Sequence, residues 1–299
     1  MTNNDYYELN KKKSIIRYTT IKPVLEQLTN IPYAIIKGEP LSKLCYGEYS
    51  RRRTSDIDIL VRRQDIALLE NELSKCGFFT NMVSREERIL ALSNSHQVTP
   101  WHKKVGDCTV TVDINFDVFW GEYKGKRFDM GDFLTDTKEI TIYNCKVKIL
   151  QQEKAFIQLL LHHYKELNSL YHLACDNSFI NPNLFKDVYF FWYNNKEYLS
   201  WEKIFFIGNE YNINQYFYYV LYFTNCIFKD VDFSLLVDKF KTLQGVELLD
   251  CYGLSDDERK YWKVDFDIRL HSKNIYELIK DELTEEDYNK LNRSKKIFE

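Results

Sequence analysis

The chain has 299 residues, a formal net charge of −3 at pH 7, 44% hydrophobic and 16% aromatic residues, and only 10 Gly and 5 Pro. Because average usage of Gly plus Pro is roughly 12%, this composition excludes disordered, collagen-like and low-complexity chains. The near-neutral charge argues against duplex nucleic acid as the main partner, since phosphate binding requires a surplus of Lys and Arg. At roughly 150 residues per domain, the length predicts about two domains.

The first half of the chain predicts a mixture of helices and strands. Apolar residues at helical spacing indicate helices over 17–29, 40–46 and 64–76, with Gly77 as the stop of the last one. Alternating or β-branched runs indicate strand segments over 33–37, 55–61, 97–105, 108–116 and 139–150. Gly106 and Asp107 predict a hairpin between two of these strands.

The sequence pattern changes at Gln151, after which apolar residues recur at helical spacing over long stretches. We therefore expect an α+β fold, with a mixed sheet and flanking helices over residues 1–150 and a mainly helical domain over 151–299. Residues 211–228 carry no formal charge, but their amide side chains are costly in hydrocarbon, which favours a buried helix over a membrane span.

The cysteines and the N-terminus indicate a cytoplasmic protein. The seven cysteines contain no CxxC pair and no metal-finger spacing, which is typical of free thiols in a reducing compartment. A basic cluster near the N-terminus is not followed by an apolar segment, so it does not predict a secretory signal.

The segment SDIDILV, at 55–61, carries two aspartates on one face of a strand. Asp56 and Asp58 share a face because residues i and i+2 of a strand point to the same side. Two parallel carboxylates repel each other, and a divalent cation supplies the missing counter-charge. The same spacing recurs at positions 230 and 265 without supporting context, and a bare DxD is more often a solvated surface feature.

Basic residues precede this strand. A β-branched run ends in Lys37 and Gly38, where glycine permits a tight turn and close approach to a phosphate. A helix that begins there would add anion affinity through its first amides. The run Arg51–Arg53 lies shortly before Asp56, and together these features predict a cradle for a metal-bound triphosphate. If these features are taken alone, the other interpretation is that the glycine belongs to an ordinary turn and that the arginines form a solvent-exposed run.

Asp113 lies in TVTVDINF, at 109–116, where Val110 and Val112 face one side of the strand and Asp113 the other. A carboxylate on an apolar strand is costly unless it is paired or binds metal. If this strand lies beside SDIDILV, Asp113 completes a three-carboxylate site that shares a metal ion and accepts the proton of an attacking hydroxyl. The alternative is a surface aspartate on an edge strand, because nothing in the sequence fixes the pairing.

These segments together resemble the DNA polymerase β-like nucleotidyltransferase superfamily. More narrowly, residues 15–180 resemble a bacterial family usually described only as uncharacterised nucleotidyltransferase. Lys37 and Gly38 match the LKG element of that family, and Arg52 matches its arginine. Its three carboxylates are matched by Asp56, Asp58 and Asp113.

Two positions depart from the pattern of the resembled proteins. Asn115 stands where the family has a histidine, and Glu39 stands where the superfamily has a serine after the glycine. The missing serine leaves more of the phosphate contact to Lys37 and Arg52.

The resemblance implies a nucleotidyltransferase-like sheet and an Mg²⁺-dependent enzyme. A hydroxyl of a small molecule, peptide or protein would attack the α-phosphorus of a nucleoside triphosphate, expected to be ATP, and pyrophosphate would leave. Two Mg²⁺ ions are expected at the catalytic residues Asp56, Asp58 and Asp113. Phosphates would be bound by Lys37, Gly38 and Arg52. Residues 151–299 would form a wall of the acceptor or nucleotide pocket.

His162 and Asp176 are the weaker pocket candidates, because they lie in the predicted helical region that continues the resemblance to the family. The other interpretation of His162 is a buried histidine whose hydrogen bonds are satisfied within the core. A second hypothesis for the whole chain is a toxin-type nucleotidyltransferase of a toxin–antitoxin or phage-defence system, which acts on tRNA or protein. A third is a catalytically degenerate binding module. The sequence does not determine the acceptor, the base, the oligomeric state or the role of residues 180–299.

Overall fold

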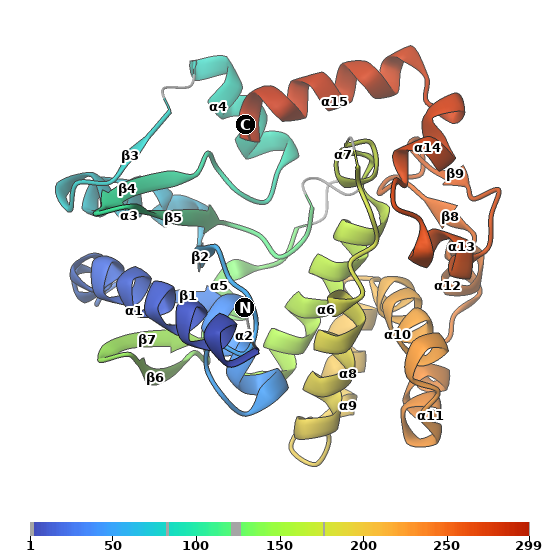
Figure 1. The fold of residues 1–299 in the computed structure, drawn as a ribbon, viewed down its shortest axis with the longest axis horizontal. Helices are drawn as coiled ribbons and strands as arrows, with labels where there is room; N and C mark the ends of the chain where they lie inside the picture. The colour runs from blue at the N-terminus through green and yellow to red at the C-terminus, as the bar shows by residue number, and fades with distance from the viewer. Residues whose placement is uncertain (1–2, 82–83, 121–126, 176, 299) are drawn as a thin grey trace. The chain divides into compact units, whose positions relative to one another are not determined.

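The computed structural model describes residues 3–81, 84–120, 127–175 and 177–298 (Figure 1). The chain divides into two compact units. The first comprises Met1–Ala155 with Tyr193–Leu199, and the second comprises Phe156–Trp192 with Ser200–Glu299.

The first unit is built on a sheet of seven strands among the described residues, in the order β3-β4-β5-β2-β1-β7-β6. The strands are β1 (Tyr33–Ile36), β2 (Asp56–Val61), β3 (Phe79–Thr80), β4 (Trp101–Val105), β5 (Cys108–Asn115), β6 (Lys138–Ile142) and β7 (Cys145–Ile149). β2 pairs in parallel with β5, and β1 in parallel with β7, while the other neighbours are antiparallel. The sheet is therefore mixed, as the sequence predicts.

Two helices of this unit pack on one face of the sheet, opposite the acidic side chains of β2. The helices of this unit are α1 (Asn3–Gln27), α2 (Gly38–Tyr46), α3 (Ile66–Lys75), α4 (Arg85–Asn94) and α5 (Met130–Phe133). Side chains of α1 and α3 form one core cluster with Ile57 and Ile59 of β2 and with alternate residues of β5. Because strand side chains alternate, Asp56 and Asp58 lie on the face opposite this core.

The predicted α+β fold class is confirmed, and so is the hairpin at Gly106 and Asp107, which joins β4 to β5. One expectation is wrong: residues 139–150 form two antiparallel strands, β6 and β7, instead of one segment. The turn between them is made by Tyr143 and Asn144, at φ 47° and 62°. Consecutive positive φ values define the tight hairpin turn that matches strand twist, but without a glycine the turn has little sequence signal. Helix α1 also begins well before residue 17, within a polar segment for which the sequence predicts no helix.

The second unit is mainly helical. Its elements are α6 (Gln152–Asn168, which begins in the first unit), α7 (Leu170–Leu173), α8 (Asn183–Asn195), α9 (Trp201–Glu210), α10 (Asn214–Phe228), α11 (Val231–Lys239), α12 (Leu243–Leu248), the hairpin β8 (Cys251–Tyr252) and β9 (Lys260–Tyr261), α13 (Phe266–His271), α14 (Tyr276–Ile279) and α15 (Glu285–Phe298). Most of α10 is buried, including Asn214, Gln215 and Thr224, as the uncharged segment predicts.

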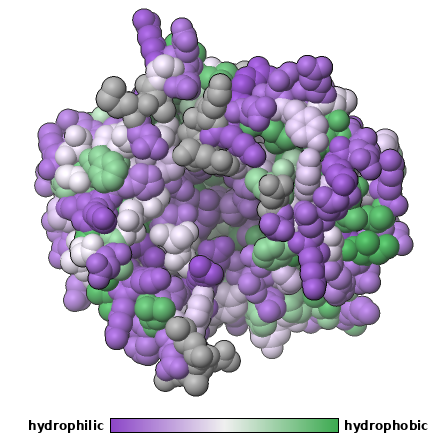
Figure 2. Space-filling view, turned by 45° about the horizontal axis from the view of Figure 1, so that its top comes forward, coloured by the Kyte–Doolittle hydropathy of each residue, from purple (hydrophilic) through white to green (hydrophobic). Residues whose placement is uncertain are grey.

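Within the described residues, no helix combines the length and the apolar character that crossing a membrane requires. The face drawn in Figure 2 is largely hydrophilic, and its hydrophobic side chains lie in small separate patches. All seven cysteines lie within the described residues, and none of them forms a disulfide bond there.

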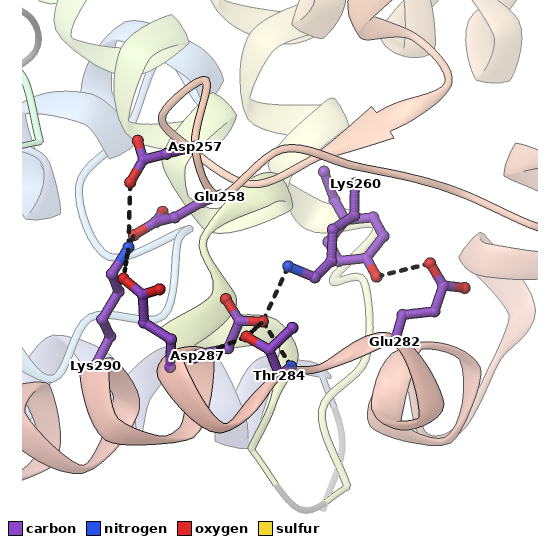
Figure 3. A network of polar contacts seen from close by, with 9 residues as sticks. Asp257, Glu258, Lys260, Glu282, Thr284, Asp287 and Lys290 are labelled. Carbon is purple, nitrogen blue, oxygen red and sulfur yellow. Dashed lines mark hydrogen bonds and ion pairs between the residues drawn. The ribbon is translucent and has the colours of Figure 1, made fainter.

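A polar network fixes the start of α15 in the second unit (Figure 3). Thr284 and Asp287 form reciprocal backbone hydrogen bonds, in which the Thr284 N–H donates to Asp287 Oδ2 at 2.8 Å and the Asp287 N–H donates to Thr284 Oγ1 at 3.3 Å. This arrangement satisfies amides that the first turn of a helix leaves without intrahelical partners. Lys260 contacts the Asp287 carboxylate at 2.9 Å, and Lys290 contacts Asp257 at 3.2 Å. These ion pairs attach α15 to β9 and to the segment before it.

The core side of β5 supplies the first prediction. Ile114 is fully buried beneath the acidic face, and Ile114→Ala should lower the free energy of unfolding by about 2–5 kcal/mol, because the lost side chain leaves a cavity in the core. Thr109→Ala, at an exposed position of the same strand, is the control and should change stability by less than about 1 kcal/mol. Urea denaturation followed by circular dichroism measures both, and equal effects would contradict the core described here.

Candidate functional site

Three predicted acidic residues are brought together by the pairing of β2 with β5. Asp58 lies directly opposite Asp113 in the parallel register, and Asp56 lies opposite Thr111. The condition stated from the sequence, that the two strands be neighbours, is therefore met. Asp58 is buried, with 4% of its surface exposed, whereas Asp56 and Asp113 are half-buried. The three carboxylates share one face of two adjacent strands.

Lys37 contacts this acidic group. Its Nζ lies 2.7 Å from Asp58 Oδ1, in an ion pair that is largely shielded from solvent. Burial alone would lower the pKa of Lys37, but the charge and hydrogen bond of Asp58 raise it above its ordinary value. The charges of Asp56 and Asp113 act in the same direction. The lysine therefore stays protonated and carries a positive charge next to all three carboxylates.

The backbone at Lys37 and Gly38 has an uncommon conformation. Lys37 has φ 60° and ψ −149°, and Gly38 has φ 51°. A non-glycine residue with positive φ costs of order 1–3 kcal/mol, and such residues cluster at functional sites. A Cβ on Gly38 would meet only Thr54 Cγ2, at 4.0 Å, so the glycine is required by its φ and not by lack of space. The turn brings the chain from β1 into the first turn of α2, whose N-terminal amides favour anions.

Arg52 lies in the loop between α2 and β2, and its side chain is half-buried, whereas its neighbours Arg51 and Arg53 are exposed. Arg51 pairs with Glu48 at 2.8 Å and stacks on the ring of Tyr7. The backbone of Arg52 is fixed from both sides: its N–H donates to Ser42 Oγ at 3.1 Å, and its carbonyl accepts from Asn10 Nδ2 at 2.8 Å. The backbone of Arg52 is thus attached to α1 and α2, whereas Arg51 is held through its side chain.

The electrostatics of the acidic face suit a bound cation. Burial, and then the charge of Asp58, raise the pKa of Asp56, and the opposing effects of Lys37 and Ser55 do not cancel this shift. A divalent cation would relieve this repulsion, and carboxylate oxygens are the ligands that Mg²⁺ prefers. The donor chemistry of Asp56, Asp58 and Asp113 therefore fits Mg²⁺. As these side chains lie, no group of three acidic, histidine or cysteine residues in the described parts of the chain has metal-binding geometry.

Asn115 and Glu39, the two positions that depart from the patterns of the resembled family and superfamily, have clear structural places. Asn115 is 1% exposed and reaches the acidic group: its Nδ2 donates to Asp58 Oδ1 at 3.4 Å and to the Asp113 carbonyl at 3.3 Å. Glu39 is also 1% exposed, and its carboxylate accepts hydrogen bonds from Ser14 and Ser50. Asn115 thus supports the carboxylates as a hydrogen-bond donor, while Glu39 is engaged by the protein's own hydroxyls and amides.

Asp117 is an acidic residue of this region that sequence analysis passed over. It lies two residues beyond β5 and is 2% exposed; its Oδ1 accepts from the Phe119 N–H at 2.9 Å, and its Oδ2 lies 3.5 Å from Arg127 Nη1. Burial raises the pKa of Asp117 to about 6, and these partners offset the shift only in part. The alternation of Asp113, Asn115 and Asp117 was the available signal, since every second residue of an extended chain lies on one side.

The remaining two predicted residues belong to other parts of the chain. His162 lies on α6 within the second unit, with its Nδ1 3.9 Å from Glu166 Oε1. Glu166 also lies 3.1 Å from His172 Nε2. Asp176 lies outside the described residues. The assignment of His162 and Asp176 to a pocket stays a prediction.

The comparison with protein families agrees with this arrangement. Residues 4–229 match the model of a family described as uncharacterised nucleotidyltransferase. The chain belongs to this family. It is therefore an enzyme of the nucleotidyltransferase class, and the matched segment includes β1, α2, β2 and β5 with all three carboxylates. A comparison with curated proteins gives no match.

Solved structures with related folds are distant. An antigenic nucleotidyltransferase-like protein from Paracoccidioides brasiliensis matches with a TM-score of 0.44 and 18% identity, over 75% of this chain and 93% of that one. The antibiotic-resistance factor ANT(2'')-Ia in solution matches with a TM-score of 0.39 and 13% identity, over 67% and 92%. Its crystal structure with adenylyl-2''-tobramycin gives a TM-score of 0.37 and 12% identity, over 66% and 97%. Likeness at this level carries no conclusion about substrate.

The raised pKa of Asp117 supplies a prediction for the nucleotidyltransferase. The pKa of Asp117 is higher in the folded protein than in the unfolded chain, so its protonated form stabilises the fold. This contribution is complete below the pKa of the unfolded chain and is lost as pH rises through about 6. Asp117→Asn removes this titration. Between pH 5 and pH 8 the variant should therefore gain about 1 kcal/mol of stability relative to the wild type.

Urea denaturation at the two pH values measures this difference. Thr109→Ala, an exposed change in β5 that removes no titratable group, is the control and should show no such pH-dependent gain. A pH-independent difference between wild type and Asp117→Asn would contradict the raised pKa.

Proposed function

We propose that this protein transfers a nucleoside monophosphate from a nucleoside triphosphate, with ATP as the donor, to a hydroxyl group of an acceptor molecule. The observation that carries the proposal is the register that sets Asp58 opposite Asp113, with Asp56 on the same face. Lys37 Nζ lies 2.7 Å from Asp58 Oδ1 in this arrangement. Family membership supports the reaction class.

In this proposal, Asp56, Asp58 and Asp113 hold Mg²⁺ and are the catalytic residues. The metal, when bound, neutralises charge on the triphosphate and on the attacking and leaving oxygens. Asp113, on β5, accepts the proton of the acceptor hydroxyl. Asn115 keeps Asp58 oriented through its 3.4 Å contact with Asp58 Oδ1.

Lys37, Gly38 and Arg52 bind the phosphates. The ammonium of Lys37 pairs with Asp58. A bound triphosphate would be a second anionic partner for the same ammonium group. Gly38 contributes its backbone to phosphate binding. It is the first residue of α2, has φ 51°, and places no side chain over the turn. Arg52 contributes a guanidinium, which is suited to phosphate oxygens because of its planar set of donors.

The acceptor class follows from the reaction and not from a defined pocket. A hydroxyl suits a base such as Asp113, because transfer needs one proton removed as the new P–O bond forms and pyrophosphate leaves. Small molecules, peptides and proteins all carry such hydroxyls. A tRNA acceptor, as in the toxin-type alternative, would carry the same chemistry and is one outcome of the labelling experiment below.

Asp58→Asn should abolish nucleotidyl transfer and leave the fold intact, because the variant loses a metal ligand and the partner of Lys37 while keeping its shape. Asp232→Asn is the matched control: it has the same DxD spacing at an exposed position of α11 and should keep wild-type activity. A folded Asp58→Asn protein, checked by circular dichroism, with normal turnover would exclude this assignment.

Incubation with each α-labelled nucleoside triphosphate and Mg²⁺, against pools of small molecules, peptides, proteins and tRNA, should label one acceptor class, most strongly with ATP. Mass spectrometry then identifies the species that gains a nucleoside monophosphate. Omission of Mg²⁺ or replacement of Asp113 by Asn should remove the label. A protein that binds no nucleotide in calorimetry and labels nothing would favour the degenerate binding module.

A further inference from the structure

The loop that carries Arg52 is attached to the protein through its backbone. The Ser50 N–H donates to Glu39 Oε2 at 2.6 Å, and the Ser50 carbonyl accepts from Asn10 Nδ2 at 2.6 Å. The Arg52 N–H and carbonyl are bonded to Ser42 and Asn10 in turn. All four backbone polar groups of Ser50 and Arg52 are thus satisfied by side chains of α1 and α2.

Glu39 is central to this attachment. Its Oε1 accepts from Ser50 Oγ at 3.2 Å and from Ser14 Oγ of α1, while its Oε2 accepts from the Ser50 amide. An ionised carboxylate with 1% exposure would be unfavourable without such donors. Because Glu39 is the second residue of α2, its position is linked directly to the Lys37–Gly38 turn.

A second buried charge completes the connection. Arg17 of α1 is 5% exposed and donates to Ser14 Oγ at 2.7 Å and to the Thr54 carbonyl at 3.0 Å. Burial lowers the pKa of Arg17, and the charge of Glu39 acts against this shift. Thr54 lies two residues before Asp56, so the same network reaches the start of β2.

Ser50 has φ 63°, a conformation that a non-glycine residue adopts rarely. The Ser50 backbone donates a hydrogen bond to Glu39 and accepts one from Asn10, and these two bonds offset the cost of the backbone conformation. Without them, Ser50 would relax toward ordinary φ values, and the direction of the chain at Arg52, two residues later, would change.

From these contacts we infer that Glu39 and Asn10 are positioning residues for nucleotide binding: they hold the Arg52 loop in a fixed place relative to the Lys37–Gly38 turn. This inference rests on the proposed function, since the ligand they serve is the triphosphate. Glu39, which stands where the resembled superfamily has a serine, supports the residues that bind the phosphates.

Glu39→Ala and Asn10→Ala should each weaken the binding of Mg²⁺-ATP by about tenfold or more, because small displacements of binding groups have large effects. Glu39→Gln should restore most of the affinity, since its amide oxygen can accept the Ser50 N–H and its NH₂ can donate to the hydroxyls. Isothermal titration calorimetry measures these affinities without knowledge of the acceptor. Once an acceptor is found, KM for ATP should rise in the alanine variants with kcat little changed.

Limited trypsin digestion gives a readout that needs no ligand. The alanine variants should be cut faster at Arg51–Arg53 than the wild type. Tyr143→Phe is the control, because it removes only a 2.7 Å contact to the Ser50 hydroxyl and leaves the backbone contacts in place. Ile142→Val, a conservative change at a fully buried residue of β6, tests whether reduced stability alone has these effects.

The outcomes separate the two proposals. Wild type that binds Mg²⁺-ATP, together with alanine variants of unchanged affinity and unchanged cleavage, would overturn the positioning role and leave the proposed function in place. Equal loss of affinity in Ile142→Val would likewise assign the effect to stability. Wild type that binds no nucleoside triphosphate would overturn the proposed function and, with it, this inference.

Discussion

The parallel pairing of β2 with β5 creates the constraint on which the site depends. It sets Asp58 directly opposite Asp113, with Asp56 two residues away on the same face, and so gathers negative charge on a partly buried surface. Burial, and then the charge of Asp58, raise the pKa of Asp56. The protein balances this charge with Lys37, whose own pKa is raised by the same carboxylates. The remaining polar groups of the region are arranged around that balance.

The two sides of β2 and β5 separate stability from chemistry. Ile57, Ile59 and Ile114 pack into the core formed with α1 and α3, and their burial fixes the register of both strands. A shift by one residue would move every aspartate into that core, at a prohibitive cost for ionised groups. The register that apolar packing favours is therefore the one that presents the carboxylates on the opposite face.

Much of this arrangement could be predicted from the sequence because it depends on local alternation. The two-residue period of SDIDILV and TVTVDINF fixes which side chains share a face, and the resemblance links them to Lys37 and Arg52. The β6–β7 turn was missed because Tyr143 and Asn144 adopt positive φ without a glycine. The support of the Arg52 loop was also missed, because Asn10 is far from Ser50 in sequence and no local pattern pairs Glu39 with Ser50.

Neighbouring residues and short patterns along the chain are enough to establish the residue types, the faces of the strands and the family. Three features depend on the folded chain: β2 and β5 are neighbours, Lys37 lies against Asp58, and Glu39 is buried among donors from α1 and the arginine loop. The near-neutral net charge of −3 gives no hint of this local order, because it averages over charges that the fold brings together in pairs. Burial and long-range hydrogen bonds depend on the whole chain, and no local pattern encodes them.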